Sequence, residues 1–153
     1  MYFIVVVALL LVLPAASVIL EATISAHDPS IMGLIGKWYV FWAGGVRLLL
    51  AGIRQVSQPR FTASEIFNLD NVSANPIVRE IGFGNLSMGT LAASTILRPA
   101  WLVPAAIVIC LYYGLAGLGH LLRDERTPKG TVAMASDAFA FLVLLTVVIN
   151  GLR

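Results

Sequence analysis

The chain has 153 residues, of which 59% are hydrophobic and only 12% are charged. Soluble domains carry roughly 25% charged and roughly 45–50% apolar residues, so this composition argues against a water-soluble fold. A formal net charge of +2, without a dense basic cluster, argues against nucleic acid as a partner. The composition predicts a single integral membrane domain over residues 1–153, with the lipid bilayer as its surroundings.

Apolar runs of membrane-spanning length predict an all-α bundle of five transmembrane helices. The first run begins almost at Met1 with no Lys or Arg before it, which is typical of a spanning helix rather than a secretory signal. The third run follows Asn75-Pro76, a pair that suits an N-cap and a first helical position. The five spans are predicted at residues 3–20, 31–53, 76–97, 101–122 and 132–152.

The link between the second and third spans is too long for a tight turn. Thr62 and Glu65 have the spacing of a capping box, which predicts a short helix. Ile66, Phe67 and Leu69 give this helix an apolar side, so we expect it to lie in the membrane surface.

The Lys and Arg residues of the short loops predict an orientation. Two links on one side of the membrane carry more of them than the other side, where only Lys37, Arg98 and Arg153 lie. The richer links and their edges hold Arg54, Arg60, Arg79, Arg123, Arg126 and Lys129. Since positively charged loops stay in the cytoplasm, the amino terminus is predicted inside and the carboxyl terminus outside.

Specific motifs occupy the second and third spans and the link between them. The chain reads KWYVFWAGGVRLLLAGIRQ from Lys37, QPRFT from Gln58 and PIVREIGFGNLSMG from Pro76. This pattern resembles a family of small bacterial membrane proteins of unknown function that are loosely similar to the DoxX-like proteins. The resemblance covers about a third of the chain. It implies a bacterial cytoplasmic (inner) membrane protein, and it implies no settled activity. DoxX-like proteins usually have four spans, one fewer than predicted here.

Arg47 is the most informative single residue, because a charge inside a membrane helix costs about 2.5–3.5 kcal/mol and usually finds a partner. At 1.5 Å per residue, Arg47 lies ~9 Å, Glu80 ~6 Å and Asp137 ~8 Å from the inner ends of their spans. His120 ends the fourth span on the same side, and Arg54 follows Arg47 on the same helix face. The sequence therefore predicts a polar layer near the inner leaflet. This layer is either a ligand or proton site or a structural ion-pair network.

A second candidate feature is the helix face formed by Gly82, Asn85 and Gly89 in the third span. Small residues let helix backbones approach closely in lipid, and an Asn side chain can form a hydrogen bond across the contact. We therefore expect another helix to pack against this face.

No metal site or cofactor is expected. One His at the end of the fourth span is too few for a haem or metal site, and Cys110, the only cysteine, lies in an apolar run. The first link places Glu21 near His27 and Asp28, but their spacing matches no metal motif.

The sequence contains no Ser–His–Asp spacing, no HExxH motif and no phosphate-binding loop, so we do not expect an enzyme. The first interpretation is a small accessory protein or subunit that acts through helix packing with membrane partners or with itself. The alternative, from a different class, is a small carrier or binder of a lipophilic ligand, a quinone or a lipid, at the layer around Arg47. An exposed seam occupied by another chain favours the first, and a cavity that reaches Arg47 favours the second.

Overall fold

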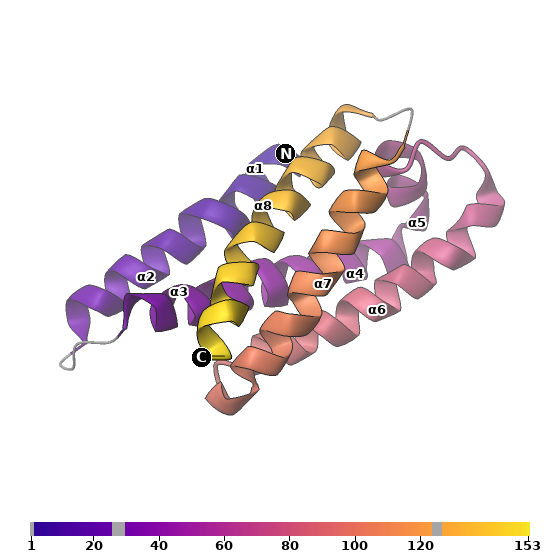
Figure 1. Cartoon of the computed structure of the whole chain (residues 1–153). Helices are drawn as coiled ribbons and strands as arrows, with labels where there is room; N and C mark the ends of the chain where they lie inside the picture. The colour runs from indigo at the N-terminus through magenta and orange to yellow at the C-terminus, as the bar shows by residue number, and fades with distance from the viewer. Residues whose placement is uncertain (1, 26–29, 124–126) are drawn as a thin grey trace.

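The computed structural model describes residues 2–25, 30–123 and 127–153, and its secondary structure over these ranges is helical, without a strand. Within the described ranges, four helices are long and apolar enough to cross a membrane. They run over Tyr2–Ile24, Ile31–Ser57, Pro99–Leu121 and Pro128–Gly151, and Figure 1 shows how they are arranged. The predicted all-helical fold with membrane-length helices is therefore confirmed.

The first of these helices changes register in its middle. It consists of α1 (Tyr2–Val7), a π-helical turn η1 (Ala8–Val12) and α2 (Leu13–Ile24). At the end of η1, the backbone N–H of Leu13 bonds the carbonyl of Ala8, five residues earlier. Pro14 follows directly, and proline lacks an N–H and clashes with the carbonyl four residues before it. The π turn accommodates this proline without ending the helix.

The second helix has the same construction. It consists of α3 (Ile31–Tyr39), the π-helical η2 (Val40–Val46) and α4 (Arg47–Ser57). The π segment ends directly before Arg47, whose backbone N–H bonds the carbonyl of Trp42. A Cβ atom on Gly45 would lie only 2.9 Å from the backbone nitrogen of Ala93, so this glycine permits the close approach of the neighbouring helix.

The third predicted span is helix α6 (Asn75–Ser94), which lies outside the set of described helices with membrane-spanning composition. Arg79 and Glu80 in its first turns and Asn85 in its middle lower its hydropathy. The predicted number of five spans is thus not confirmed, although α6 packs against α4.

The predicted N-cap of α6 is wrong. Asn75 has helical backbone angles and already belongs to the helix. The preceding turn η4 (Val72–Ala74) is capped instead by Asn71, whose side chain accepts a hydrogen bond of 2.9 Å from the backbone N–H of Ser73. Since an Asx turn can form at either asparagine, spacing alone did not distinguish the two positions.

The predicted short helix of the link is present, but its predicted capping box is not. The helix begins earlier, as α5 (Pro59–Phe61), and continues as the π-helical η3 (Thr62–Ile66), which has no side-chain cap bond. The Glu65 carboxylate pairs with Lys129, and the Thr127 hydroxyl donates to the Glu65 carbonyl. These two contacts connect the link between the second helix and α6 to the start of the last helix.

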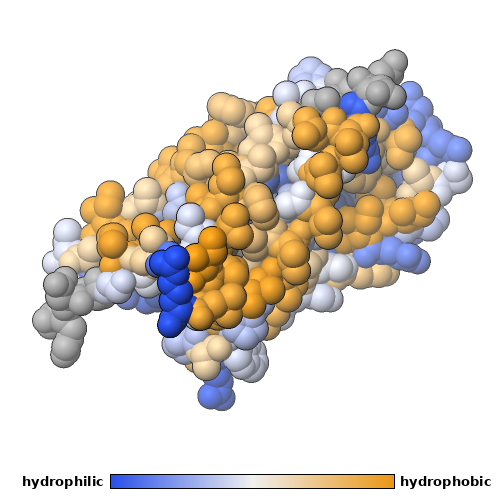
Figure 2. Space-filling model, viewed as in Figure 1, coloured by the Kyte–Doolittle hydropathy of each residue, from blue (hydrophilic) through white to orange (hydrophobic). Residues whose placement is uncertain are grey.

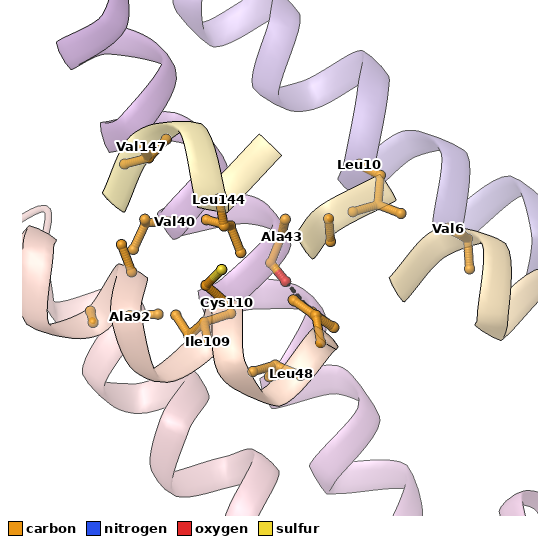
Figure 3. Close-up of a cluster of buried hydrophobic side chains, with 14 residues drawn as sticks. Val6, Leu10, Val40, Ala43, Leu48, Ala92, Ile109, Cys110, Leu144 and Val147 are labelled. Carbon is orange, nitrogen blue, oxygen red and sulfur yellow. Dashed lines mark hydrogen bonds between the residues drawn. The ribbon is translucent and has the colours of Figure 1, made fainter. Parts of the chain in front are cut away.

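The bundle closes with η5 (Pro99–Trp101), α7 (Leu102–Leu121) and α8 (Pro128–Gly151). Val40, Ile109 and Leu144 are completely buried where η2, α7 and α8 meet, as Figure 3 shows. Cys110 is buried in the same core, as expected of a small apolar residue. The face of the molecule seen in Figure 2 is largely apolar between its more polar ends, which suits a protein surrounded by lipid.

Candidate functional site

A buried ion pair joins α4 to α8. Arg47 Nη2 donates to Asp137 Oδ1 at 2.7 Å and also to the Ser136 hydroxyl at 2.8 Å. The side chains of Arg47 and Asp137 are only 12% and 9% exposed. A charge-assisted bond in such a dry setting is stronger than one between neutral groups, so it fixes the relative position of the two helices.

Tyr113 of α7 holds the same guanidinium from another side. Its ring centre lies 4.8 Å from Arg47 Cζ, a distance at which the ring face attracts the cation. Its hydroxyl donates to the carbonyl of Ala43 in the π segment η2, and the dashed line at Ala43 in Figure 3 marks this bond. Tyr113 thereby connects α7 to the helix that carries Arg47.

His120 extends the group toward the end of the bundle. Its Nε2 lies 4.0 Å from Asp137 Oδ2, and its ring centre lies 5.9 Å from that of Phe67 in the link. Arg123 stacks over Phe67 at 4.4 Å and donates to its carbonyl at 3.3 Å. The link therefore covers this end of the group. We call Arg47, Tyr113, His120, Ser136 and Asp137 the polar cluster.

Arg47 has hydrogen-bonding capacity that the described residues do not use. Its Nη1 is buried and has no hydrogen-bond partner among them, while Nη2 makes both bonds. A buried donor without an acceptor costs about 1–3 kcal/mol, and more when it is charged. The polar cluster therefore presents a desolvated cationic donor that an acceptor of another molecule would stabilise.

A groove of about 500 Å³ lies between α7 and α8 beside the polar cluster. Its lining includes Tyr113, which is the one member of the polar cluster that lines it, and Gly117. The ring of Tyr113 faces Arg47, and a Cβ atom on Gly117 would lie 3.7 Å from the Cβ atom of Asp137. The groove and the polar cluster therefore share one wall.

Of the predicted inner-leaflet layer, the structure brings Arg47, Asp137 and His120 together, but not Glu80 or Arg54. Glu80 is exposed and forms no ion pair with a described residue. Arg54 is also exposed, and its guanidinium lies 3.7 Å over the ring of Phe61. The prediction that Glu80 and Arg54 belong to the polar layer was therefore wrong. Depth fixes only one coordinate of a side chain, and its direction around the helix axis decides which neighbour it meets.

The predicted packing face on α6 contacts the second helix. A Cβ atom on Gly89 would lie 2.8 Å from the backbone nitrogen of Leu49, and one on Gly82 would lie 3.1 Å from the Gly52 carbonyl oxygen. The distance at Gly89 is shorter than real Cβ contacts to backbone, so this position requires glycine, and the distance at Gly82 leaves little room for a side chain.

Asn85, between these glycines, donates from Nδ2 to Gln55 Oε1 at 2.7 Å in a buried bond. The partner residues on the second helix were not identified from the sequence. A signal was present, because Gly45 and Gly52 stand seven residues apart, as do Gly82 and Gly89.

The sequence reasoning also missed Ser136 and the polar contact near the opposite end of the bundle. There, Glu21 accepts hydrogen bonds from Lys37 Nζ and from Trp38 Nε1, each at 2.7 Å, which ties α2 to α3. Three residues considered above lie outside the described ranges: His27, Asp28 and Arg126. Within those ranges, no three His, Cys, Asp or Glu side chains gather as metal ligands would.

Comparisons with known proteins give one family. No curated protein and no solved structure matches the chain. The profile of a family of unknown function, DUF6790, matches residues 1–149, and nothing in this match links the chain to the DoxX-like proteins. Since the match covers nearly the whole length, the chain belongs to the DUF6790 family.

Proposed function

We propose that this protein is an integral membrane protein that binds a lipophilic ligand, a quinone or a lipid, at the polar cluster. The observation that carries the proposal is the buried Nη1 of Arg47, which lacks an acceptor among the described residues. Guanidinium carries five donors in a fixed fork, and here one terminal nitrogen makes both bonds while the other makes none. An acceptor atom of a ligand would give Nη1 the hydrogen bond that it lacks.

A purely structural ion pair accounts for less of this arrangement. The Arg47–Asp137 pair explains the bond of Nη2 to the carboxylate, but it does not explain why Nη1 is buried without an acceptor among the described residues. Charged residues within membrane helices commonly mark ligand or ion pathways. The accessory-subunit interpretation stays a prediction, and purification in mild detergent tests it by showing whether another protein co-purifies.

The double change Arg47→Gln/Asp137→Asn should leave the protein folded but remove the bound ligand. It replaces both charged groups with neutral amides, so it leaves no unpaired charge, yet it removes the cationic donor. The measurement is mass spectrometry of the lipids extracted from protein purified in mild detergent.

The matched control is Arg54→Gln/Glu80→Gln, which changes two exposed charges outside the polar cluster. We expect the wild type and this control to retain the same molecule and the cluster variant to lose it. Equal retention by all three would overturn the binding proposal. A stoichiometric protein companion without any retained lipophile would instead favour the accessory subunit.

The proposal includes five crossings of a bacterial cytoplasmic membrane, with α6 as the third and the amino terminus inside. Arg60 and the 81%-exposed Leu97 lie on links at the two ends of α6. In a Cys110→Ala background, Leu97→Cys should react with an impermeant thiol reagent in intact cells. Arg60→Cys should react only after permeabilisation. The same behaviour at both positions would mean that α6 does not cross.

A further inference from the structure

A pocket of about 270 Å³ lies where the link between α4 and α6 meets the start of α6. We call it the link pocket. Among the residues that the structure describes, no member of the polar cluster lines it. The spanning helix Ile31–Ser57 ends directly before the link, and Figure 1 shows the link at one end of the bundle. In a bilayer crossed by this helix, the link pocket therefore lies at the level of the lipid headgroups.

The link pocket carries one charge of each sign. Arg60 and Asp70 both line it, and both are exposed. Neither forms an ion pair with a described residue, because the four described pairs join other side chains. The pocket therefore offers a cation and an anion to one ligand, rather than an ion pair that is already formed.

Apolar side chains lie beside these charges. Leu69 and Val72 also line the pocket and are 46% and 56% exposed. Apolar surface next to charge is typical of protein segments that lie at the boundary between headgroups and acyl chains. The volume is slightly below the usual range for whole small molecules, roughly 300–1,000 Å³. It suits the head of a lipid whose chains stay in the membrane.

We infer that the link pocket binds the head of a zwitterionic phospholipid with a primary ammonium group, that is, a phosphatidylethanolamine. Arg60 pairs with the phosphate, whose oxygens match the fork of a guanidinium group. Asp70 accepts hydrogen bonds from the ammonium group. A head with only negative charge would pair with Arg60 but would leave Asp70 without a partner, so the two residues together select a zwitterion.

The lining also selects ethanolamine over choline. A quaternary ammonium has no N–H to donate, and proteins usually recognise it with the faces of aromatic rings. None of the lining residues that the structure describes is aromatic. A primary ammonium has three N–H donors, which suit the carboxylate of Asp70.

The test is a titration of delipidated full-length protein in mild detergent, with bound lipid counted by native mass spectrometry. The probes are dioleoyl phospholipids with ethanolamine, choline or glycerol heads. The ethanolamine lipid should bind about tenfold more tightly than the choline lipid, a difference of about 1.4 kcal/mol. It should also bind more tightly than the glycerol lipid, which is anionic.

Two variants separate the two halves of the head. Asp70→Asn should make the ethanolamine and choline lipids bind equally, because the carboxylate that distinguishes them is gone. Arg60→Gln should weaken both by about fivefold, since both carry the phosphate and one Arg at the membrane surface contributes about 1 kcal/mol. The controls are Arg79→Gln and Glu80→Gln, which change exposed charges outside the pocket lining. Both should keep the wild-type affinities.

Three results would overturn the inference. One is equal binding of the ethanolamine and choline lipids by the wild type, or a preference that survives Asp70→Asn. Another is tighter binding of the glycerol lipid, which would mean an anionic ligand. The third is equal affinity for glycerophosphoethanolamine, the same head without acyl chains, which would mean a soluble ligand rather than a lipid. Arg47→Gln/Asp137→Asn should bind the ethanolamine lipid normally, so this site and the polar cluster are tested independently.

Discussion

Replacing Arg47 alone by alanine should lower the free energy of unfolding by about 3–5 kcal/mol. The change removes the cation but leaves the Asp137 carboxylate 9% exposed, without the donor that now bonds it at 2.7 Å. It also removes a hydrogen bond to Ser136 and the contact with the ring of Tyr113. Most of the cost comes from the uncompensated charge rather than from the lost bonds. Equilibrium unfolding in detergent measures it.

Arg54→Ala is the matched control, because Arg54 is exposed and its described ring contact is with Phe61. An exposed cation–π contact is worth about 0.5–1 kcal/mol, so this variant should lose no more than that. The double change Arg47→Ala/Asp137→Ala should recover part of the loss, since it removes both charges. If Arg47→Ala and Arg54→Ala cost the same, the buried ion pair does not contribute as the geometry indicates.

Gly89→Ala should also be strongly destabilising, although it adds only one methyl group. The new Cβ atom would lie 2.8 Å from the Leu49 nitrogen and 3.0 Å from the Gly45 carbonyl oxygen. Both atoms belong to backbone, so no rotamer change relieves the overlap and the two helices must separate. Overpacking typically costs about 1–3 kcal/mol, and the loss of the close α4–α6 contact places this variant at the upper end.

Gly84→Ala lies on the same helix, but its Cβ atom would meet nothing within 4 Å. Alanine is favoured over glycine inside a helix by about 0.8–1.0 kcal/mol, so this variant should raise the melting temperature while Gly89→Ala lowers it. Shifts of the same sign in thermal unfolding would contradict the packing of α6 on α4.

Most helix positions were predictable, because membrane-length apolar runs separated by polar links leave few alternatives. The second span was predicted at residues 31–53 and runs over Ile31–Ser57, so its start is correct and its end is four residues short. The π segments were not predicted, since they depend on backbone register rather than on composition. The spanning role of α6 stays open because Glu80 and Asn85 weaken its apolar pattern.

The depth of the site residues along their helices could be predicted from the sequence, but the direction in which each side chain points could not. Glu80 and Asp137 had nearly equal depth, so the sequence left both as partners of Arg47. The structure brings Asp137 to Arg47, whereas the contact of α6 with α4 through Gly82 and Gly89 leaves Glu80 exposed. The close approach of α4 and α6 fixes how α6 is rotated about its own axis. This rotation can be inferred from the sequence only when the glycines of both helices are considered together.

Infrared difference spectroscopy of a quinone labelled with ¹³C at its carbonyls tests the central claim most directly, because it reports on the bond to Arg47 itself. On binding the wild type, one carbonyl stretching band should move to lower frequency, as expected for a charge-assisted hydrogen bond. The band should stay at its detergent position in Arg47→Gln/Asp137→Asn and should shift normally in Arg54→Gln/Glu80→Gln. If the quinone binds all three proteins and its carbonyl band shifts identically in each, Arg47 does not hold the ligand.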